Sequence, residues 1–274
     1  MNDSDFSDVA ERRLIFSINS GRSGSKYLAQ LLATAANVTS FHEAEPQMAG
    51  EYLAMVNAAD FAQSRAPRRI KAQAIARTLR GTKPDETYAE TNHMFIKTFF
   101  DVVLEAFRNV DVIILRRDLA LVLKSFIEMG YFSPLNPQAL RWMSSPNSAT
   151  AALRPIGADA DLDQYDAAIA YLLDIEARAL RFQREYPAVR THEVRLEELN
   201  DSAAVEDLFQ RLNLSATTRT SELCGQRVND RPHRKEHFRN PTTVQECRAR
   251  LAAYVEKAKR LGIEIPPSAA LELE

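Results

Sequence analysis

The sequence lacks several features that would place it in a special class of protein. Its 2 cysteines, Cys224 and Cys247, cannot form a disulfide framework, and we expect both to be buried thiols. The N-terminal stretch MNDSDFSD has neither the basic nor the apolar region of a secretory signal, so we expect a cytoplasmic location. No run approaches the roughly 18 apolar residues of a membrane span. A formal net charge of −2 argues against a general nucleic-acid binder, so any anion site must be local.

Helix and strand patterns alternate along the chain. No interior segment separates two cores, so we expect one domain over 1–274. The apolar, β-branched runs predict strands at 13–18, 38–42, 94–99, 110–116 and 189–195. The helix-period segments lie at 24–36, 51–59, 66–80, 101–108, 119–129, 161–185, 201–212 and 242–261. This order predicts an α/β fold with a mainly parallel sheet flanked by helices, in which ligands bind beyond the carboxyl ends of the strands.

Two segments have no regular pattern. Residues 81–93 are polar, and residues 131–160 are rich in proline, serine and alanine. Segments of this length in a compact domain are either binding loops or disordered, so we expect substrate loops in both places and leave the alternative open. Tyr131, Phe132 and Trp142 could form an apolar or sugar-stacking wall there, although aromatic residues are more often part of the core.

The stretch SINSGRSGSKYLAQLL, from Ser17 to Leu32, predicts a strand, a tight loop and a helix. Gly21 and Gly24 permit a tight turn whose backbone N–H groups gather at the helix N-terminus, where a phosphate or sulfate is favoured. Arg22 and Lys26 add full positive charges, and the serines between them add hydroxyl donors. The alternative is a plain strand-to-helix turn capped by serine. The density of anion ligands favours an anion site.

The two most common phosphate-binding motifs are absent from this loop. The triphosphatase loop G-x-x-x-x-G-K-[ST] does not match, because the glycines are too close together and no lysine directly follows the second. The dinucleotide fingerprint G-x-G-x-x-G does not match either. The loop therefore needs another explanation.

The residues of this loop resemble the 5′-phosphosulfate loop of sulfotransferases that use 3′-phosphoadenosine-5′-phosphosulfate (PAPS), in the form "GRSGSxxL" of the carbohydrate and bacterial branches. The resemblance implies a P-loop-like three-layer sandwich with a central mainly parallel sheet. It also implies that Ser23, Gly24, Ser25 and Lys26 hold the 5′-phosphate. Arg22 would replace the lysine that the cytosolic branch places near the bridging oxygen.

A second motif follows the strand at 110–116. In the family, the 3′-phosphate site is an arginine at the strand end and a serine eight positions later, and Arg117 and Ser125 reproduce this spacing. A guanidinium suits this role because it donates to a phosphate in a bidentate fork. One departure is Leu119, where the family often has proline. The alternative is structural, with Arg116 or Arg117 paired to Asp118. A third fragment, Val194-Arg-Leu-Glu-Glu-Leu199, resembles another strand end of the family.

Sulfuryl transfer needs a base for the acceptor hydroxyl and positive groups for the departing phosphate, and it has no obligatory metal. In the carbohydrate branch the base is a glutamate shortly after the 5′-phosphate loop. Glu43, in the stretch FHEAEP, is the best positional match, with Glu45 next. His42 is the alternative base because its ordinary pKa lies near neutrality. A carboxylate here could instead be solvated or paired with Arg22 or Lys26.

The cytosolic branch places its base in a K-T-H motif, where this chain has Lys97-Thr98-Phe99. The histidine is therefore missing, while Lys97 could still stabilise charge on the transferred group. His93 falls at the start of the strand expected at 94–99, so we assign it only to a substrate loop.

The basic segment VNDRPHRKEHFR, from Val228 to Arg239, resembles the C-terminal basic loop that closes over the cofactor in the family. Arg234 and Lys235 are therefore candidate cofactor ligands, although a solvated surface loop is equally consistent with the residues. His233 and His237 could bind zinc, but H-E-x-x-H is absent and no third ligand is evident, so we expect no metal site.

Together these observations predict a sulfotransferase that transfers a sulfuryl group from PAPS to a hydroxyl or amine of a carbohydrate or small molecule, leaving 3′-phosphoadenosine-5′-phosphate (PAP). Glu43 would act as base and deprotonate the acceptor, and Arg22 and Lys97 would stabilise the transferred group. The alternatives are a small-molecule kinase with a phosphate loop, and a non-catalytic nucleotide-binding protein of the same fold. The acceptor and the oligomeric state do not follow from the sequence.

Overall fold

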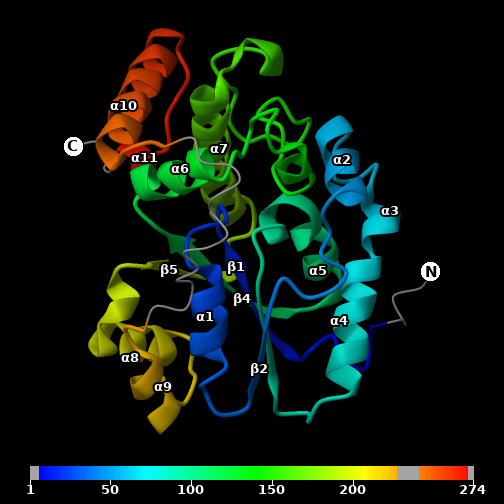
Figure 1. The fold of residues 1–274 in the computed structure, drawn as a ribbon. Helices are drawn as coiled ribbons and strands as arrows, with labels where there is room; N and C mark the ends of the chain where they lie inside the picture. The colour runs from blue at the N-terminus through cyan, green and yellow to red at the C-terminus, as the bar shows by residue number, and fades with distance from the viewer. Residues whose placement is uncertain (1–5, 227–240, 271–274) are drawn as a thin grey trace. The chain divides into compact units, whose positions relative to one another are not determined.

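The computed structural model describes residues 6–226 and 241–270 (Figure 1). Its chain divides into two compact units. The first unit takes in the described residues of Met1–Met48, Arg65–Arg116 and Tyr186–Asp230. The second takes in those of Ala49–Ser64, Arg117–Glu185 and Arg231–Glu274. The expectation of one domain over 1–274 stays a prediction.

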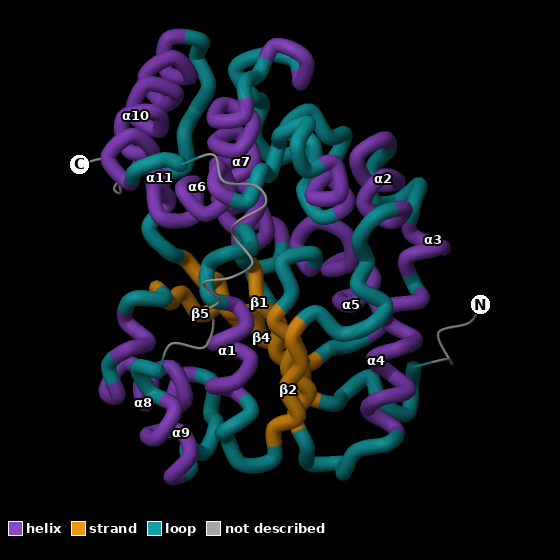
Figure 2. Tube along the Cα trace, viewed as in Figure 1, coloured by secondary structure: helices purple, strands orange, loops and turns teal. Residues whose placement is uncertain are grey.

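The first unit is built on a five-stranded parallel sheet with the strand order β2-β3-β1-β4-β5, drawn in orange in Figure 2. The strands are β1 (Arg13–Ile18), β2 (Val38–His42), β3 (Thr87–Thr91), β4 (Asn109–Arg116) and β5 (Arg190–Arg195). The central strand β1 is paired on both sides, so that Leu14 lies opposite Tyr88 of β3 and opposite Val110 of β4. The prediction of a mainly parallel sheet is confirmed.

Helices cover both faces of this sheet. They are α1 (Ser25–Leu32), α3 (Arg65–Arg68), α4 (Ile70–Arg80), η2 (Phe95–Phe99), α5 (Phe100–Ala106), η5 (Glu198–Asn200), α8 (Ser202–Arg211) and α9 (Thr218–Leu223). Apolar residues of α1 and α8 form one buried cluster with the face that carries Ile15 and Ile113. On the other face, Phe16 stacks on Phe95 of η2 with ring centroids 4.7 Å apart. The three-layer arrangement predicted from the sequence is therefore confirmed.

One predicted strand is wrong. Residues 94–99 were expected to be extended, but Phe95–Phe99 forms a π-helical turn, and the strand lies earlier, at Thr87–Thr91, inside the range 81–93 that was expected to be a loop. Asn92 starts the turn, because its Oδ1 accepts a hydrogen bond from the Met94 N–H at 2.8 Å. The turn is buried on all sides, and an apolar run of this kind does not distinguish a buried strand from a buried helical turn.

The second unit consists of helices and connecting segments. Its elements are α2 (Glu51–Ala58), α6 (Leu119–Glu128), η3 (Pro137–Arg141), η4 (Asp159–Asp161), α7 (Gln164–Glu185), α10 (Val244–Arg260) and α11 (Pro267–Ala270). Asp118 caps α6 by accepting a hydrogen bond from the Leu121 N–H at 3.0 Å. No helix in the described part of the chain is long and apolar enough to cross a membrane.

The segment 131–160 of the second unit is irregular, as predicted, apart from the short helices η3 and η4. Side chains of α7 hold it. Gln164 Nε2 donates to the Tyr131 carbonyl at 2.9 Å, and Asp174 Oδ1 accepts from the Leu153 N–H at 3.0 Å. Leu135 and Leu140 are exposed large apolar residues of this segment. A role in acceptor binding stays a prediction.

Candidate active site

The loop between β1 and α1 is shaped by Asn19. The Asn19 Oδ1 accepts hydrogen bonds from the Gly21 N–H at 3.0 Å and from the Ser23 hydroxyl at 3.4 Å. Its Nδ2 donates to the Ser17 hydroxyl at 2.9 Å, so the amide is held on both sides while it is almost completely buried. Asn19 is not among the site residues predicted from the sequence. An asparagine before Ser-Gly is nevertheless a recognisable signal, because its side chain commonly bonds the backbone two residues on.

The backbone of this loop is left-handed at several residues. The φ angles are 79° at Gly21, 57° at Arg22 and 89° at Gly24. Left-handed residues of this kind let successive N–H groups gather in a concavity that binds anions. Gly24 is the N-cap of α1 and offers no side-chain cap, and the first turn of the helix has no acidic residue. The positive end of α1 is therefore available to a negatively charged group.

Gly24 is also required by close packing. A Cβ atom at this position would lie 2.4 Å from Cδ1 of Leu196, the residue that follows β5. The Leu196 N–H donates to the carbonyl of Arg116 at 2.8 Å, which fixes it against the end of β4. The loop is thus held against the carboxyl ends of two neighbouring strands.

The side chains of the loop differ in exposure. Arg22 is exposed and Lys26 is half-buried, whereas Ser23 and Ser25 are buried. The ammonium group of Lys26 makes no hydrogen bond or ion pair with any residue that the structure describes. This loop therefore combines two cationic side chains with the backbone donors at the N-terminus of α1.

Glu43 lies between two histidines just beyond the carboxyl end of β2. Its Oε1 is 3.9 Å from Nε2 of His42 and 3.6 Å from Nε2 of His93. The backbone of Glu43 is left-handed, with φ of 54°, and its N–H donates to the Thr91 carbonyl at 3.1 Å. Glu45, the next carboxylate, is exposed and accepts from the Gln47 N–H at 3.2 Å.

His93 is part of this cluster, which the sequence analysis did not expect. Because β3 ends at Thr91, His93 follows the carboxyl end of the strand instead of preceding its start. The Nζ of Lys97, one π-helical turn later, lies 2.9 Å from its Nδ1. Burial, followed by the charges of Lys97 and His42, holds the pKa of His93 well below its usual value, so the ring is neutral.

The cluster of Glu43, His42, His93 and Lys97 contacts the loop between β1 and α1. Thr91 donates its hydroxyl proton to the Ser25 carbonyl at 2.8 Å, and both its Oγ1 and its carbonyl lie within 3.2 Å of the His42 Nδ1. A Cβ on Gly21 would come within 3.3 Å of the His93 Nδ1. The acid and imidazole groups therefore lie next to the loop at the carboxyl edge of the sheet.

A buried ion pair supports the segment that carries Glu43. Lys71 of α4 and Glu90 of β3 are both completely buried, with Nζ 2.7 Å from Oε1. The same Nζ donates to the carbonyl of Ala44 at 2.7 Å, and Tyr88 and Asn92 donate to the Glu90 carboxylate. Burial lowers the pKa of Lys71, while the charge of Glu90 opposes this shift. Lys71 thus ties the backbone next to Glu43 to the sheet.

The remaining predicted ligands do not lie in the first unit. Arg117 and Ser125 are half-buried residues of the second unit, at the start of α6 and within it. Asp118 caps α6 and lies 3.0 Å from Arg248. Arg116 pairs with Glu193 at 2.6 Å. Arg234 and Lys235, together with His233 and His237, lie outside the described residues.

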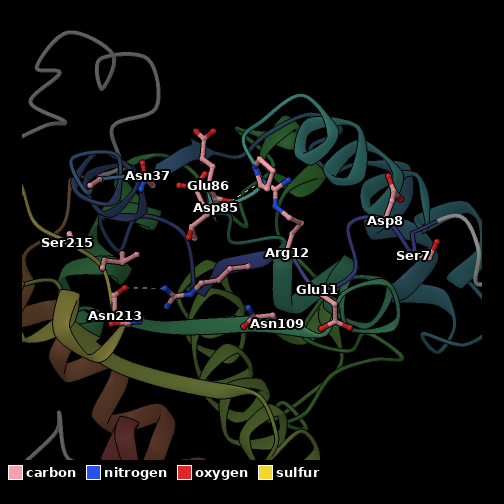
Figure 3. A pocket seen from close by; sticks show the side chains of 15 residues that line it. Ser7, Asp8, Glu11, Arg12, Asn37, Asp85, Glu86, Asn109, Asn213 and Ser215 are labelled. Carbon is pink, nitrogen blue, oxygen red and sulfur yellow. Dashed lines mark hydrogen bonds between the residues drawn. The ribbon is translucent and has the colours of Figure 1, made fainter.

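A cavity of about 650 Å³ opens at the other edge of the sheet, where the strands begin (Figure 3). Asp8, Glu11, Asp85 and Glu86 line it together with several amide side chains. Arg12 and Arg13 also line it, but the Arg12 guanidinium donates to backbone carbonyls, including that of Leu79 at 3.0 Å, and Arg13 pairs with Asp111 at 3.1 Å. Its acidic lining does not suit an anion, so we place the candidate site at the carboxyl edge despite the size of this cavity.

No group of three or more His, Cys, Asp or Glu residues is arranged to hold a metal ion in the described ranges of the chain. The groups that meet at the carboxyl edge are instead an anion-binding loop, a carboxylate, two imidazoles and a buried ammonium group. Such a set can bind a phosphate or sulfate and can move a proton beside it.

No protein-family model matches the sequence, and no curated protein matches it. Several solved structures are similar to it. The sulfotransferase domain from the curacin biosynthetic pathway has a TM-score of 0.52 at 15% identity, covering 93% of this chain and 99% of that one. A sulfotransferase from Alicyclobacillus acidocaldarius has a TM-score of 0.50 at 12% identity, covering 91% of this chain and 94% of that one. Sulfotransferase STF9 from Mycobacterium avium has a TM-score of 0.50 at 12% identity, covering 96% of this chain and 80% of that one. The chain therefore has the fold of the sulfotransferases, as the resemblance of its loop predicts.

Proposed function

We propose that the protein is a sulfotransferase that transfers a sulfuryl group from PAPS to a hydroxyl or amine of a carbohydrate or small-molecule acceptor. One observation carries the proposal: a loop built for an anion lies directly against a cluster that contains a carboxylate and two imidazoles. The fold shared with solved sulfotransferases supports it.

The residues of the loop fit the 5′-phosphosulfate end of such a donor. The positive φ angles of Gly21 and Gly24 allow the backbone of the loop to turn in front of α1, and Gly24 leaves the N-terminus of that helix without a side-chain cap. The donor, when bound, supplies the sulfuryl group and leaves as PAP. Arg22 and Lys26 would stabilise the negative charge on the departing 5′-phosphate, and the N–H groups of the loop would hold that phosphate.

Glu43 is the proposed base. Its carboxylate is partly exposed, so it can meet an acceptor, and it lies at the carboxyl edge together with the loop. It takes the proton of the acceptor hydroxyl as the oxygen attacks sulfur. His42, with one nitrogen held by Thr91, is the alternative base. Lys97 has no exposed surface and contacts His93, so we assign it an indirect role and no contact with the transferred group.

Arg117 and Ser125 are proposed to hold the 3′-phosphate, as the resemblance of the second motif implies. Arg117 has the guanidinium that suits a dianionic phosphate, and both residues are accessible at the start of α6 or within it. Arg234 and Lys235 keep their proposed role as cofactor ligands. The acceptor class and the cytoplasmic location are likewise proposals.

The donor proposal is tested by thermal unfolding with PAP and with ATP. A ligand that binds the native state alone stabilises it by RT ln(1 + [L]/Kd), which is about 2.7 kcal/mol at 100 times Kd. We expect a clear rise in Tm with PAP and none with ATP. A response to ATP and not to PAP would contradict the proposal in favour of a kinase. Arg117→Ala should reduce the response to PAP and leave the response to adenosine 5′-phosphosulfate, which lacks the 3′-phosphate, unchanged.

The base is tested by Glu43→Gln, with Glu45→Gln as the matched control. We expect Glu43→Gln to lower sulfuryl transfer from labelled PAPS to a panel of acceptors by about 100-fold or more, because general base catalysis contributes about that much. The stabilisation by PAP should persist. Glu45→Gln removes a nearby exposed carboxylate and should change the rate little. Equal rates for Glu43→Gln and the unsubstituted enzyme would remove Glu43 from the mechanism.

A further inference from the structure

The two histidines beside Glu43 are opposite tautomers, with the proton on Nδ1 in His42 and on Nε2 in His93. The tautomer of His42 follows from its contacts with Thr91. The Thr91 carbonyl can only accept a hydrogen bond, and its hydroxyl proton is already donated to the Ser25 carbonyl. The His42 Nδ1, 3.1 Å from that carbonyl and 3.2 Å from that hydroxyl, must therefore be the donor. The Nε2 of neutral His42 carries no proton where it faces Glu43 at 3.9 Å.

The arrangement of His93 is the reverse. The Lys97 ammonium group has protons to donate and cannot accept, so the His93 Nδ1 at 2.9 Å is the acceptor. The single proton of the neutral ring therefore lies on Nε2, which faces Glu43 Oε1 at 3.6 Å. His93 is 5% exposed and Lys97 is 0% exposed, so water does not compete for the contact between these two side chains.

We propose that His93 is a positioning residue for Glu43: its Nε2–H, held in place by Lys97, orients the carboxylate that acts as base. This inference rests on the proposed function for the role of Glu43. Lys97 fixes the proton of His93, and the Nε2–H of His93 in turn presents its partial positive charge to one carboxylate oxygen, which lies 3.6 Å away and thus just beyond hydrogen-bond distance. The other carboxylate oxygen remains available to the acceptor.

Two further observations support a donor role for His93 and exclude it as the base. Burial and the nearby positive charge keep its ring neutral at working pH, so it cannot take up a proton from Glu43. Its ring also packs against Gly21, where a Cβ would approach its Nδ1 to 3.3 Å. The absence of a side chain at Gly21 therefore leaves room for the ring in the position where its Nε2 faces Glu43.

The proton arrangement is measured by NMR on the full chain with ¹⁵N-labelled histidine, because the ring-nitrogen shift distinguishes a protonated nitrogen from a bare one. The chain has 5 histidines, and His42→Gln and His93→Gln assign two of the signals. We expect His93 to keep a bare Nδ1 and a protonated Nε2 from about pH 5 to about pH 8. Neutral His42 should show the opposite pattern.

Lys97→Met tests whether Lys97 sets this arrangement. Met keeps the length of the side chain and removes the donor, so His93 should lose its bare Nδ1 signature and its pKa should rise. Titration of His93 in the unsubstituted protein between about pH 5 and about pH 8 would overturn the proposal. An unchanged His93 pattern in Lys97→Met would also overturn it. Neither readout depends on enzymatic activity.

The effect on catalysis is tested by comparing His93→Leu with His93→Gln. Gln carries an N–H close to the position of the imidazole Nε2, whereas Leu fills the space without a donor. We expect His93→Leu to lower kcat about 100-fold with an unchanged KM for the donor, because a misplaced catalytic group costs about this much. His93→Gln should restore most of the rate. Equal rates for both variants and the unsubstituted enzyme would contradict the positioning role.

These outcomes are distinct from failure of the proposed function. If PAP stabilises none of the proteins, the donor proposal fails, whatever the NMR pattern of His93. If PAP stabilises all of them and His93→Gln is as slow as His93→Leu, the donor proposal stands and the positioning role of His93 is wrong.

Discussion

At the scale of single residues, Gly24 shows how the loop depends on the absence of a side chain. Its φ of 89° is strained for any other residue, and a Cβ would also approach Leu196 Cδ1 to 2.4 Å. The same residue is the uncapped start of α1. Backbone conformation, packing and anion binding therefore meet at one position.

We expect Gly24→Ala to lower the free energy of unfolding by about 2 to 3 kcal/mol and to abolish stabilisation by PAP. Gly262→Ala is the matched control, because Gly262 has a φ of 70° but no atom within 4 Å of the added Cβ. It should cost about 1 kcal/mol and leave the response to PAP intact. Denaturant unfolding and thermal shift measure both effects. An equal loss in the two variants would show that contact with Leu196 contributes nothing.

Single residues also show what the sequence could predict. The loop was found because its glycines, serines and cations are adjacent in the chain. Asn19 was missed because its effect is a buried hydrogen bond to the Gly21 backbone. His93 was misassigned because its position depends on where β3 ends, and no local pattern marks that point. Its contact with Glu43 is a long-range contact, which the sequence does not display.

At the scale of elements, most of the sheet followed from the sequence because β1 and β4 each contain an uninterrupted run of buried apolar residues, at 14–16 and 112–115. β3 was missed. It contains Glu90 and is flanked by polar residues, so its composition does not indicate a buried strand. The η2 turn was mistaken for a strand because it is buried on all sides and contains the apolar residues Phe95, Ile96 and Phe99, a composition that a buried strand shares. The turn brings Lys97 next to His93, which an extended segment would not do.

The Lys71 and Glu90 pair joins α4 to β3 and gives a prediction at this scale. We expect Lys71→Met alone to cost about 3 to 5 kcal/mol of unfolding free energy, because it leaves the Glu90 carboxylate buried without its partner charge. The double variant Lys71→Met with Glu90→Gln should cost less than the single one. Denaturant unfolding of the unsubstituted protein, the two single variants Lys71→Met and Glu90→Gln, and the double variant completes a double-mutant cycle. Additive losses would show that the two side chains do not interact.

At the scale of the whole molecule, acid stability depends on Asp111 at the amino edge of the sheet. Burial would raise the pKa of its carboxyl, but hydrogen bonds from His192 and Arg190 and the charges of Arg13 and Arg190 outweigh burial and hold the pKa far below the usual 3.8. The folded pKa is thus depressed. The stabilisation is fully present above the unfolded value and is lost as pH falls below it toward the folded value.

We therefore expect the free energy of unfolding to fall by about 2 kcal/mol as the pH is lowered from about 5 to about 2. Asp111→Asn should be less stable at neutral pH and should show a flatter dependence over the same range. Denaturant unfolding at a series of pH values measures both slopes. Parallel slopes would assign the acid sensitivity to other carboxylates.

The strand order described above also bears on the synthesis of the chain. The central strand β1 pairs with β3 and β4, which are translated much later than β1 itself. Long-range parallel pairing of this kind is slow to form, and until it forms both edges of β1 have unpaired backbone groups. A nascent chain in which β4 has not yet been translated therefore exposes an apolar, aggregation-prone segment immediately before the loop. We expect the nascent chain to depend on chaperones at that stage.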